Sequence, residues 1–333
     1  MDIKRLRTLW KRWLARQKAG ADLRLLSRGV GCPGGPLVFS VVRNEMLRLP
    51  RFLAHYRTLG AAGFVMVDNN STDGTPDFLR QQRDVCLYGT DSHFLGKESW
   101  FDFLLRKHGK ARWCVVVDAD ELLVYADSDR VMLPELCRYL QQTGCNALHA
   151  ILLDLYPEGA VSDVNYVTGS DYFEMEWFHD PLSSLEKAPR HFSRDAGLDF
   201  RFEGGTRKRV FGVTACCSKF PLFRQGAGIF LTDGQHYLEA GRFSELRAVL
   251  CHFKYLQDFA LHVREEVVRG QHWGGAVEYR AYAETLDRAE TGLRFRDQNS
   301  VKFSGGSQLE ECGFLTRPDS YEKFVSLTGG VKR

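Results

Sequence analysis

Short apolar runs alternate with amphipathic stretches between residues 37 and 117, and this rhythm constrains the fold more than any other feature. The apolar runs are rich in residues that favour strands, and the stretches between them show helical spacing. The predicted strands are Leu37–Val42, Phe64–Val67, Val85–Tyr88 and Trp113–Val117. Strands and helices that alternate at these lengths form right-handed crossovers and a largely parallel sheet. The sequence therefore predicts an α/β fold that binds its ligands beyond the carboxyl ends of the strands.

Helices are predicted between these strands and again near the end of the chain. The first begins at Leu49 and ends before Gly60, the second passes through Phe78 and Leu79, and the third contains Trp100, Leu104 and Leu105 and ends at Gly109. Residues 155–235 have weak periodicity, many aromatic side chains and many Gly, which indicates loops and short strands. Beyond His252 the chain is predicted to be helical, with Tyr255, Phe259 and Val263 on one face and a further helix over Val277–Leu286.

The N-terminal segment is strongly basic. It holds seven Lys and Arg residues between Lys4 and Lys18 and no acidic residue. Apolar residues recur at helical spacing among them, at Leu6, Leu9, Trp10, Trp13 and Leu14. This pattern is typical of a helix that lies in an anionic membrane interface, so residues 1–20 predict a peripheral membrane contact. The alternative is a leader helix that packs on the domain or frays.

Charge and cysteine usage limit the classes of partner and the compartment. With 45 basic and 42 acidic side chains the net charge is +3, and outside the leader the cations are mixed with acids, so a nucleic-acid partner is not expected. The nine cysteines include no C-x-x-C pair, which indicates reduced thiols and a cytoplasmic protein. We find no secretory signal and no apolar run long enough to span a bilayer.

Polar residues directly follow three of the predicted strands. These strand ends read Arg43-Asn44-Glu45, then Asp68-Asn69-Asn70-Ser71-Thr72-Asp73-Gly74-Thr75, and finally Asp118-Ala119-Asp120-Glu121. Because they meet at one edge of a parallel sheet, we expect them to share a crevice. The Asp118-x-Asp120 spacing suits a divalent cation that keeps positions free for substrate phosphates. The alternative is that each acidic end caps a turn or a helix.

Residues 37–325 resemble the family-2 glycosyltransferases with the GT-A fold. The resemblance rests on Val67–Thr75 and on Val117–Glu121 some 45 residues later. Further segments resemble a bacterial branch of that family, namely Arg43-Asn44-Glu45, Gly204-Gly205-Thr206-Arg207-Lys208-Arg209, Lys219-Phe220-Pro221-Leu222 and His252-Phe253-Lys254. The resemblance implies a Rossmann-like three-layer sandwich with a mostly parallel central sheet and additional C-terminal helices.

The resemblance also implies roles for individual residues in binding a nucleotide-sugar. Asp68 would contact the base and Asp118 the ribose, while Asp73 would hold the loop or the bound base. Arg43 and Glu45, at the end of the first strand, would belong to the same donor site.

A metal site is implied by the same resemblance. Asp120 would bind the metal and His252 would complete the site. His236, in a polar turn, is the rival histidine, and a core histidine is the alternative for His252. Imidazole beside carboxylate favours Mn²⁺ over Mg²⁺.

Cations of the second half are candidates for binding phosphate. Lys254 could reach the diphosphate as a point charge. Arg207 and Arg209 follow two glycines that allow a close backbone approach, so they could hold phosphate or an anionic acceptor. The alternative is a solvated hairpin that carries surface charges.

The catalytic base is not fixed by any motif, because the Glu-Asp dipeptide usual in the family is absent from the segment after the metal motif. Inverting transfer needs a carboxylate that deprotonates the acceptor hydroxyl. The candidates are Asp171, Glu174, Glu176, Asp180 and Glu203. We favour Asp180, beside His179, or Asp171.

Together these patterns predict transfer of a sugar from a UDP- or GDP-sugar to a saccharide or lipid-linked acceptor, with inversion. The predicted parts are 1–36, a basic leader and Gly/Pro linker; 37–154, the nucleotide-sugar-binding half; 155–255, the acceptor-facing half of the same domain; and 256–333, a helical extension. The alternatives are a sugar-1-phosphate nucleotidyltransferase on the same fold and a non-catalytic, membrane-tethered binding protein. Nucleotidyltransferases of this kind carry a Gly-rich loop for the nucleoside triphosphate after the first strand. Arg43-Asn44-Glu45 stands at that place and is not Gly-rich, which argues against this alternative.

Overall fold

The computed structural model describes residues 3–29, 34–189, 198–226, 228–232, 235–289 and 291–328. Part of the predicted linker, residues 30–33, lies outside the described residues. Within them, no helix has both the length and the apolar character needed to cross a bilayer.

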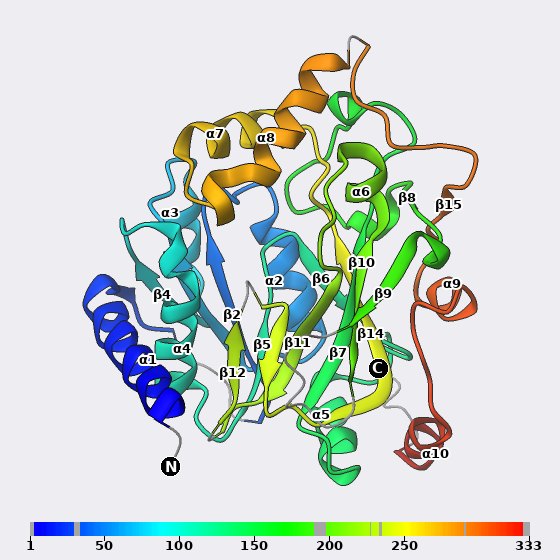
Figure 1. Ribbon diagram of the computed structural model, residues 1–333. Coiled ribbons are helices and arrows are strands. Elements are labelled where there is room, and N and C mark those ends of the chain that lie inside the picture. Colours follow the sequence, from blue (N-terminus) through cyan, green and yellow to red (C-terminus); the bar gives the residue numbers. More distant parts are fainter. Residues whose placement is uncertain are drawn as a thin grey trace.

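A nine-stranded sheet forms the centre of the molecule (Figure 1). Its strands, in spatial order, are β1 (Arg24–Ser27), β4 (Val85–Gly89), β3 (Gly63–Asp68), β2 (Leu37–Val42), β5 (Trp113–Val116), β11 (Ser218–Arg224), β7 (Ala147–Asp154), β14 (Phe243–His252) and β6 (Glu121–Val124). Strands β2, β3, β4, β5, β7 and β14 point one way, and β1, β6 and β11 run against them. The predicted α/β fold with a mostly parallel sheet is confirmed.

Helices cover both faces of this sheet, which explains why its central strands are continuous apolar runs. Every residue of β2 and of β3 is buried, as expected for parallel strands enclosed on both sides. On one face the core includes α2 (Leu49–Thr58), α3 (Thr75–Arg80) and α5 (Leu133–Gln142). On the other it includes α1 (Ile3–Asp22) and α4 (Lys97–His108). The molecule is therefore a three-layer sandwich.

Further helices, short ladders and single turns surround the sheet, most of them from the second half of the chain. The remaining helices are α6 (Gly205–Phe211), α7 (Phe259–Arg269), α8 (Trp273–Arg288), α9 (Gly306–Glu311) and α10 (Asp319–Thr328). Two-stranded ladders pair β8 (Phe178–His179) with β15 (Val301–Lys302), β9 (Leu185–Pro189) with β10 (Phe200–Gly204), and β12 (Phe230–Thr232) with β13 (Tyr237–Glu239). Single 3₁₀ turns are η1 (Phe94–Gly96), η2 (Val161–Asp163), η3 (Tyr172–Glu174) and η4 (Leu182–Ser184).

The two helices predicted after His252 are present with different bounds. Helix α7 begins at Phe259, so Tyr255, which was predicted on its face, precedes it. Helix α8 is longer than the predicted 277–286.

The connection between β5 and β6 crosses the carboxyl edge of the sheet. These two strands are separated in sequence by residues 117–120 alone, yet β11, β7 and β14 lie between them in the sheet. Each of the three intervening strands has a polar residue at or next to that edge: Lys219 in β11, Asp154 in β7 and His252 in β14. The segment that carries Asp118 and Asp120 therefore passes over side chains from three other strands.

The N-terminal segment contains a sheet strand besides the predicted helix. Helix α1 packs along α4 at the side of the molecule (Figure 1). Residues 24–27, part of the predicted leader and linker, form β1 and pair with β4. The side chains of Lys4, Arg5, Leu6, Arg7 and Leu9 lie outside the described residues. The division of the chain into four parts stays a prediction.

Candidate functional site

A cleft of about 630 Å³ lies at the carboxyl edge of the sheet. Residues from the predicted strand ends line it, together with residues of α7 and α8. Of the predicted site residues, it contains Arg43, Glu45, Asp118, Asp120, Arg207, His252 and Lys254. Two of the three strand ends that were expected to share one crevice, the Arg43–Glu45 turn and the Asp118–Asp120 segment, therefore do so. Asp68 and Asp73, from the strand end between them in sequence, are not among its described lining residues.

Three side chains in this cleft are arranged as metal ligands. One ligand atom each from Asp120, Glu121 and His252 lies within 4.8 Å of the others. Nε2 of His252 is 2.9 Å from Oδ2 of Asp120. Two carboxylates and one imidazole form a mixed oxygen and nitrogen set that suits Mn²⁺ and other divalent first-row metals. The rival His236 also lines the cleft but is not in this group; its Nδ1 donates to the Ser218 carbonyl at 2.9 Å.

His252 is oriented from behind by a buried ion pair. Its Nδ1 donates to Oδ1 of Asp154 at 2.6 Å, and Nε of Arg207 donates to Oδ2 of Asp154 at 3.0 Å. Burial opposes a charged ring, but the carboxylates of Asp120 and Asp154 outweigh it and raise the pKa of His252 to about 9. A ring nitrogen fixed by a carboxylate leaves the other nitrogen directed at a metal.

Arg207 therefore faces inward. Its side chain is buried, and the two glycines begin the short helix α6. The alternative of a solvated hairpin is wrong, because Gly204 and Gly205 adopt positive φ angles and turn the chain into a helix. The binding of phosphate or acceptor by Arg207 stays a prediction.

Asp118 is held by two lysines. Nζ of Lys97 lies 2.6 Å from its Oδ1, and Nζ of Lys219 lies 3.2 Å from its Oδ2. Lys219 also pairs with Glu121. Burial opposes ionisation, but the two ammonium groups outweigh it and keep the pKa of Asp118 below its usual range. The carboxylate is thus charged and fixed at the rim of the metal group.

The loop after β3 is tied to the loop after β2. Asp73 accepts from the backbone N–H of Met46 at 2.9 Å and of Thr75 at 3.0 Å, so it holds the loop. Arg43 donates to the carbonyls of Asn69 at 3.0 Å and Asn70 at 2.6 Å. Among the described residues, Oδ1 of the buried Asp68 has no hydrogen-bond partner. A buried carboxylate oxygen without a donor is an acceptor that a ligand N–H could satisfy.

Glu45 and Lys254 lie on the α7 and α8 side of the cleft. Burial raises the pKa of Glu45 to about 8, while Arg48 beside it works in the opposite direction. Nζ of Lys254 lies 4.8 Å from the ring centres of both Tyr279 and Tyr282. The two rings hold this ammonium at the cleft wall by cation–π attraction.

The remaining predicted residues lie elsewhere. Asp180 is buried against Arg209, whose Nε is 2.9 Å from its Oδ2, and it accepts from the Tyr156 hydroxyl at 2.6 Å. Asp171 forms an ion pair with Arg51 at 2.7 Å and caps η3. Asp171, Asp180 and Arg209 are not among the described residues that line the cleft. Their proposed roles in catalysis and phosphate binding find no support in this placement.

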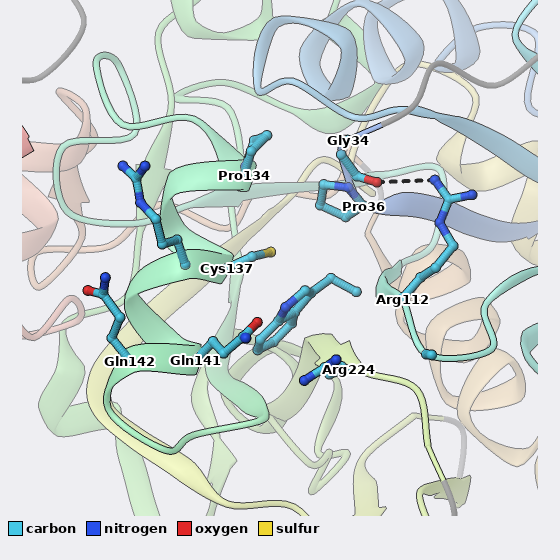
Figure 2. A pocket seen from close by; sticks show the side chains of 12 residues that line it. Gly34, Pro36, Arg112, Pro134, Cys137, Gln141, Gln142 and Arg224 are labelled. Carbon is cyan, nitrogen blue, oxygen red and sulfur yellow. Dashed lines mark hydrogen bonds between the residues drawn. The ribbon is translucent and has the colours of Figure 1, made fainter.

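A second cavity of about 800 Å³ opens at the opposite edge of the sheet, where β2 and β5 begin (Figure 2). Figure 2 shows Arg224 near Gln141 of α5, and Arg112 across the cavity from that helix. The Arg112 guanidinium donates to the carbonyl of Gly35 at 3.4 Å. No Asp or Glu is among its described lining residues. The candidate metal ligands line the other cleft.

Sequence reasoning assigned no role to four polar residues of the site: Lys97, Glu121, Asp154 and Lys219. Asp154 had a usable signal, because it directly follows the apolar run 150–153 just as Asp118 follows its own run. Glu121 and Lys219 stand inside the quoted motifs. Lys97, a lone lysine at the start of a helix, carries no signal in the sequence.

No family model matches the chain, and no curated protein matches it. Among solved structures, one to which it is similar is the mannosyltransferase PcManGT from Pyrobaculum calidifontis, described in complex with GDP-Man and Mn2+. The identity is 20%, the TM-score is 0.28, and the match covers 42% of this chain and 43% of that one. The chain thus spans less than half the length of this neighbour, and the functional conclusion rests on the geometry of the site.

Proposed function

We propose that the protein is a divalent-metal-dependent glycosyltransferase with a GT-A fold. In this proposal it moves a sugar from a UDP- or GDP-sugar to a hydroxyl of a saccharide or lipid-linked acceptor, with inversion. The observation that carries the proposal is the group of Asp120, Glu121 and His252 in a cleft at the carboxyl edge of the sheet. Open α/β sheets bind nucleotides at that edge.

The donor would lie between the loop after β3 and the metal group. Oδ1 of Asp68 is buried without a donor, so it supports a role in accepting an N–H of the base. Asp120 and His252, with Glu121, would hold a divalent metal, Mn²⁺ before Mg²⁺. Such a metal supplies Lewis-acid neutralisation of the charge that develops on the diphosphate. Lys254 adds a fixed positive charge on the same cleft wall.

For the catalytic base we propose Glu203 in place of Asp180 and Asp171. Of the five carboxylates that the sequence offered, Glu203 is the one among the described lining residues of the cleft. It lies in β10, it is partly exposed, and Nε of Arg201 is 2.5 Å from its Oε1. A carboxylate in this position supports proton transfer from an acceptor hydroxyl that enters the cleft.

The acceptor and the cellular setting complete the proposal. A lipid-linked acceptor would reach the cleft from a membrane surface, and we propose a cytoplasmic protein with a peripheral membrane contact through residues 1–20. The structural basis for that contact is argued in the next subsection.

Mn²⁺-dependent nucleotide binding tests the proposed function. We expect the correct nucleotide-sugar to raise the unfolding temperature only when Mn²⁺ is present, because a ligand that binds the native state stabilises it by mass action. The Asp120→Ala variant should lose both this shift and hydrolysis of the donor sugar. Asp171→Ala, which changes a carboxylate outside the cleft, serves as the matched control. The proposal would be overturned if the Asp120→Ala variant bound UDP and GDP with the same affinity as wild type.

A further inference from the structure

Helix α1 is attached to the domain through its polar side. Nε of Arg16 lies 2.7 Å from Oδ2 of Asp102 on α4. Arg12 pairs with Glu239 of β13, and its guanidinium lies 4.5 Å from the ring centre of Phe230. Near the C-terminal end of the helix, Ala19 is buried. Two of the seven cations of this segment therefore dock the helix on the domain.

The opposite side of α1 carries an exposed apolar stripe. Trp10, Trp13 and Leu14 expose 60%, 43% and 47% of their surface. These positions, with exposed Gln17, follow the i, i+3, i+4, i+7 spacing of one helix face. The two indole rings stack on each other, with 5.0 Å between their centres.

This arrangement reverses the usual orientation of a surface helix, which buries its apolar face against the protein. Helix α1 lies beside α4 (Figure 1) and contacts the domain through Arg12, Arg16 and Ala19, so the stripe on its opposite side points away from the domain. Two Trp and one Leu displayed together form an exposed apolar surface of the kind that marks an interaction site. Exposed apolar side chains on a monomer are usually scattered singly, whereas these two indoles lie together on neighbouring turns.

We propose that this stripe, defined by Trp10, Trp13 and Leu14, docks the protein on an anionic lipid surface. The exposed lysines Lys11 and Lys18 lie along the helix with the stripe. Residues 3–20 contain no acidic side chain. Trp is favoured at the level of the lipid headgroups, and exposed Lys is attracted by anionic lipids. The stripe supplies apolar insertion and the lysines supply the charge.

A second copy of the chain fits this face less well than a lipid surface does. Two such helices packed stripe to stripe would bring Lys11 and Lys18 of each copy together. Because α1 offers no carboxylate between residues 3 and 20, the like charges would repel without compensation. Anionic headgroups provide the missing negative charge.

Vesicle flotation of the full-length protein tests this inference without a sugar donor, so it can fail independently of the proposed reaction. The probes are vesicles of phosphatidylcholine with phosphatidylglycerol and vesicles of phosphatidylcholine alone. We expect wild type to float with the anionic vesicles, less at high salt. The double variant Trp10→Glu, Trp13→Glu should bind about tenfold more weakly or worse. Leu327→Glu is the matched control, since Leu327 is an equally apolar residue, 87% exposed on the distant helix α10, and should float like wild type.

Three outcomes would overturn the inference. The first is flotation of the double variant equal to that of wild type, and the second is no flotation of wild type at all. The third is concentration-dependent dimerisation of wild type in sedimentation, abolished by the double variant, since that would assign the stripe to a second copy of the chain. Unchanged thermal unfolding of the double variant shows that the helix and the domain are intact, as expected for side chains that are exposed.

Discussion

The His252 ring is fixed by Asp154, whose Oδ1 lies 2.6 Å from Nδ1 of the ring. The bond directs Nε2 toward Asp120. Because Asp154 ends β7 and His252 ends the adjacent parallel strand β14, where the two residues are register partners, the sheet itself sets this contact. The histidine of the proposed metal site is thus held by two neighbouring strands, which favours a fixed ligand geometry, while Asp120 comes from the connection between β5 and β6.

Asp154→Asn should weaken Mn²⁺ binding by about 10- to 100-fold, as is typical when the carboxylate behind a metal-bound histidine is lost. The amide keeps the shape of the side chain but removes the charge that orients the imidazole N–H. Titration of the protein with Mn²⁺, followed by electron paramagnetic resonance, measures this change. Asp171→Asn serves as the control and should bind Mn²⁺ like wild type. An Asp154→Asn affinity equal to that of wild type would show that His252 is not a ligand.

Arg207→Met should destabilise the fold by about 3–5 kcal/mol, because it removes the guanidinium that pairs with the buried Asp154 carboxylate. The side chains of this pair are 7% and 4% exposed. Arg264→Met breaks the Arg264–Asp287 pair, whose side chains are about 60% exposed, and should cost less than about 1 kcal/mol. Urea unfolding of both variants at neutral pH measures the difference, and equal losses would contradict this account of Arg207.

Glu203→Gln should slow sugar transfer by about 10²- to 10⁴-fold, the usual contribution of a general base. Affinity for the donor should stay unchanged, because Glu203 is not one of the metal group. Release of the nucleoside diphosphate from the donor reports the rate, and thermal shift reports the binding. Asp180→Asn provides the comparison: if it slows transfer more than Glu203→Gln while the fold stays intact, the base has been misassigned.

Stability should fall in mild acid because of buried neutral histidines. Burial lowers the pKa of His55 to about 4, with a smaller effect of Arg51, and its Nε2 donates to the carbonyl of Leu123 at 3.0 Å. Below pH 6.5 the unfolded chain takes up a proton at His55 that the native state takes up only near pH 4. The free energy of unfolding therefore decreases as the pH falls through this window, by about 2 kcal/mol from this residue between pH 7 and pH 5.

Urea unfolding of wild type and His55→Gln at pH 7 and pH 5 measures this contribution. The glutamine amide can still donate a hydrogen bond but does not titrate. The variant should therefore lose less stability than wild type between the two pH values. An identical loss in both proteins would show that His55 does not contribute to the acid sensitivity.

Local patterns allowed the strands and helices between residues 37 and 117 to be predicted. The strand predicted over Leu37–Val42 has these bounds in the structure. The helix predicted from Leu49 begins there, with Pro50 in its first turn. Both follow from short-range properties, namely continuous burial of a parallel strand and the tolerance of proline at a helix start. Asp118 and Asp120 were placed by the same reasoning, because they directly follow a strand.

Contacts between distant parts of the chain could not be predicted in this way. Arg207 carries the same charge as Arg209, and nothing in the local sequence shows that the first is buried against Asp154 while the second, which is exposed, pairs with Asp180. The choice of Asp180 as base finds no support because its contacts come from distant parts of the chain. Its neighbours Tyr156 and Arg209 satisfy its oxygens, and only the tertiary structure shows them.

The position of β6 determines when the site can form during synthesis. In the sheet β6 pairs with β14, which follows it by more than a hundred residues in the sequence. A nascent chain that has emerged only as far as Asp120 and Glu121 has no partner for this strand and lacks His252. Pairing of strands so distant in sequence is slow, because a long loop must close first. We therefore expect that a ribosome-bound chain halted before residue 243 has no metal site, and that the site forms late in folding.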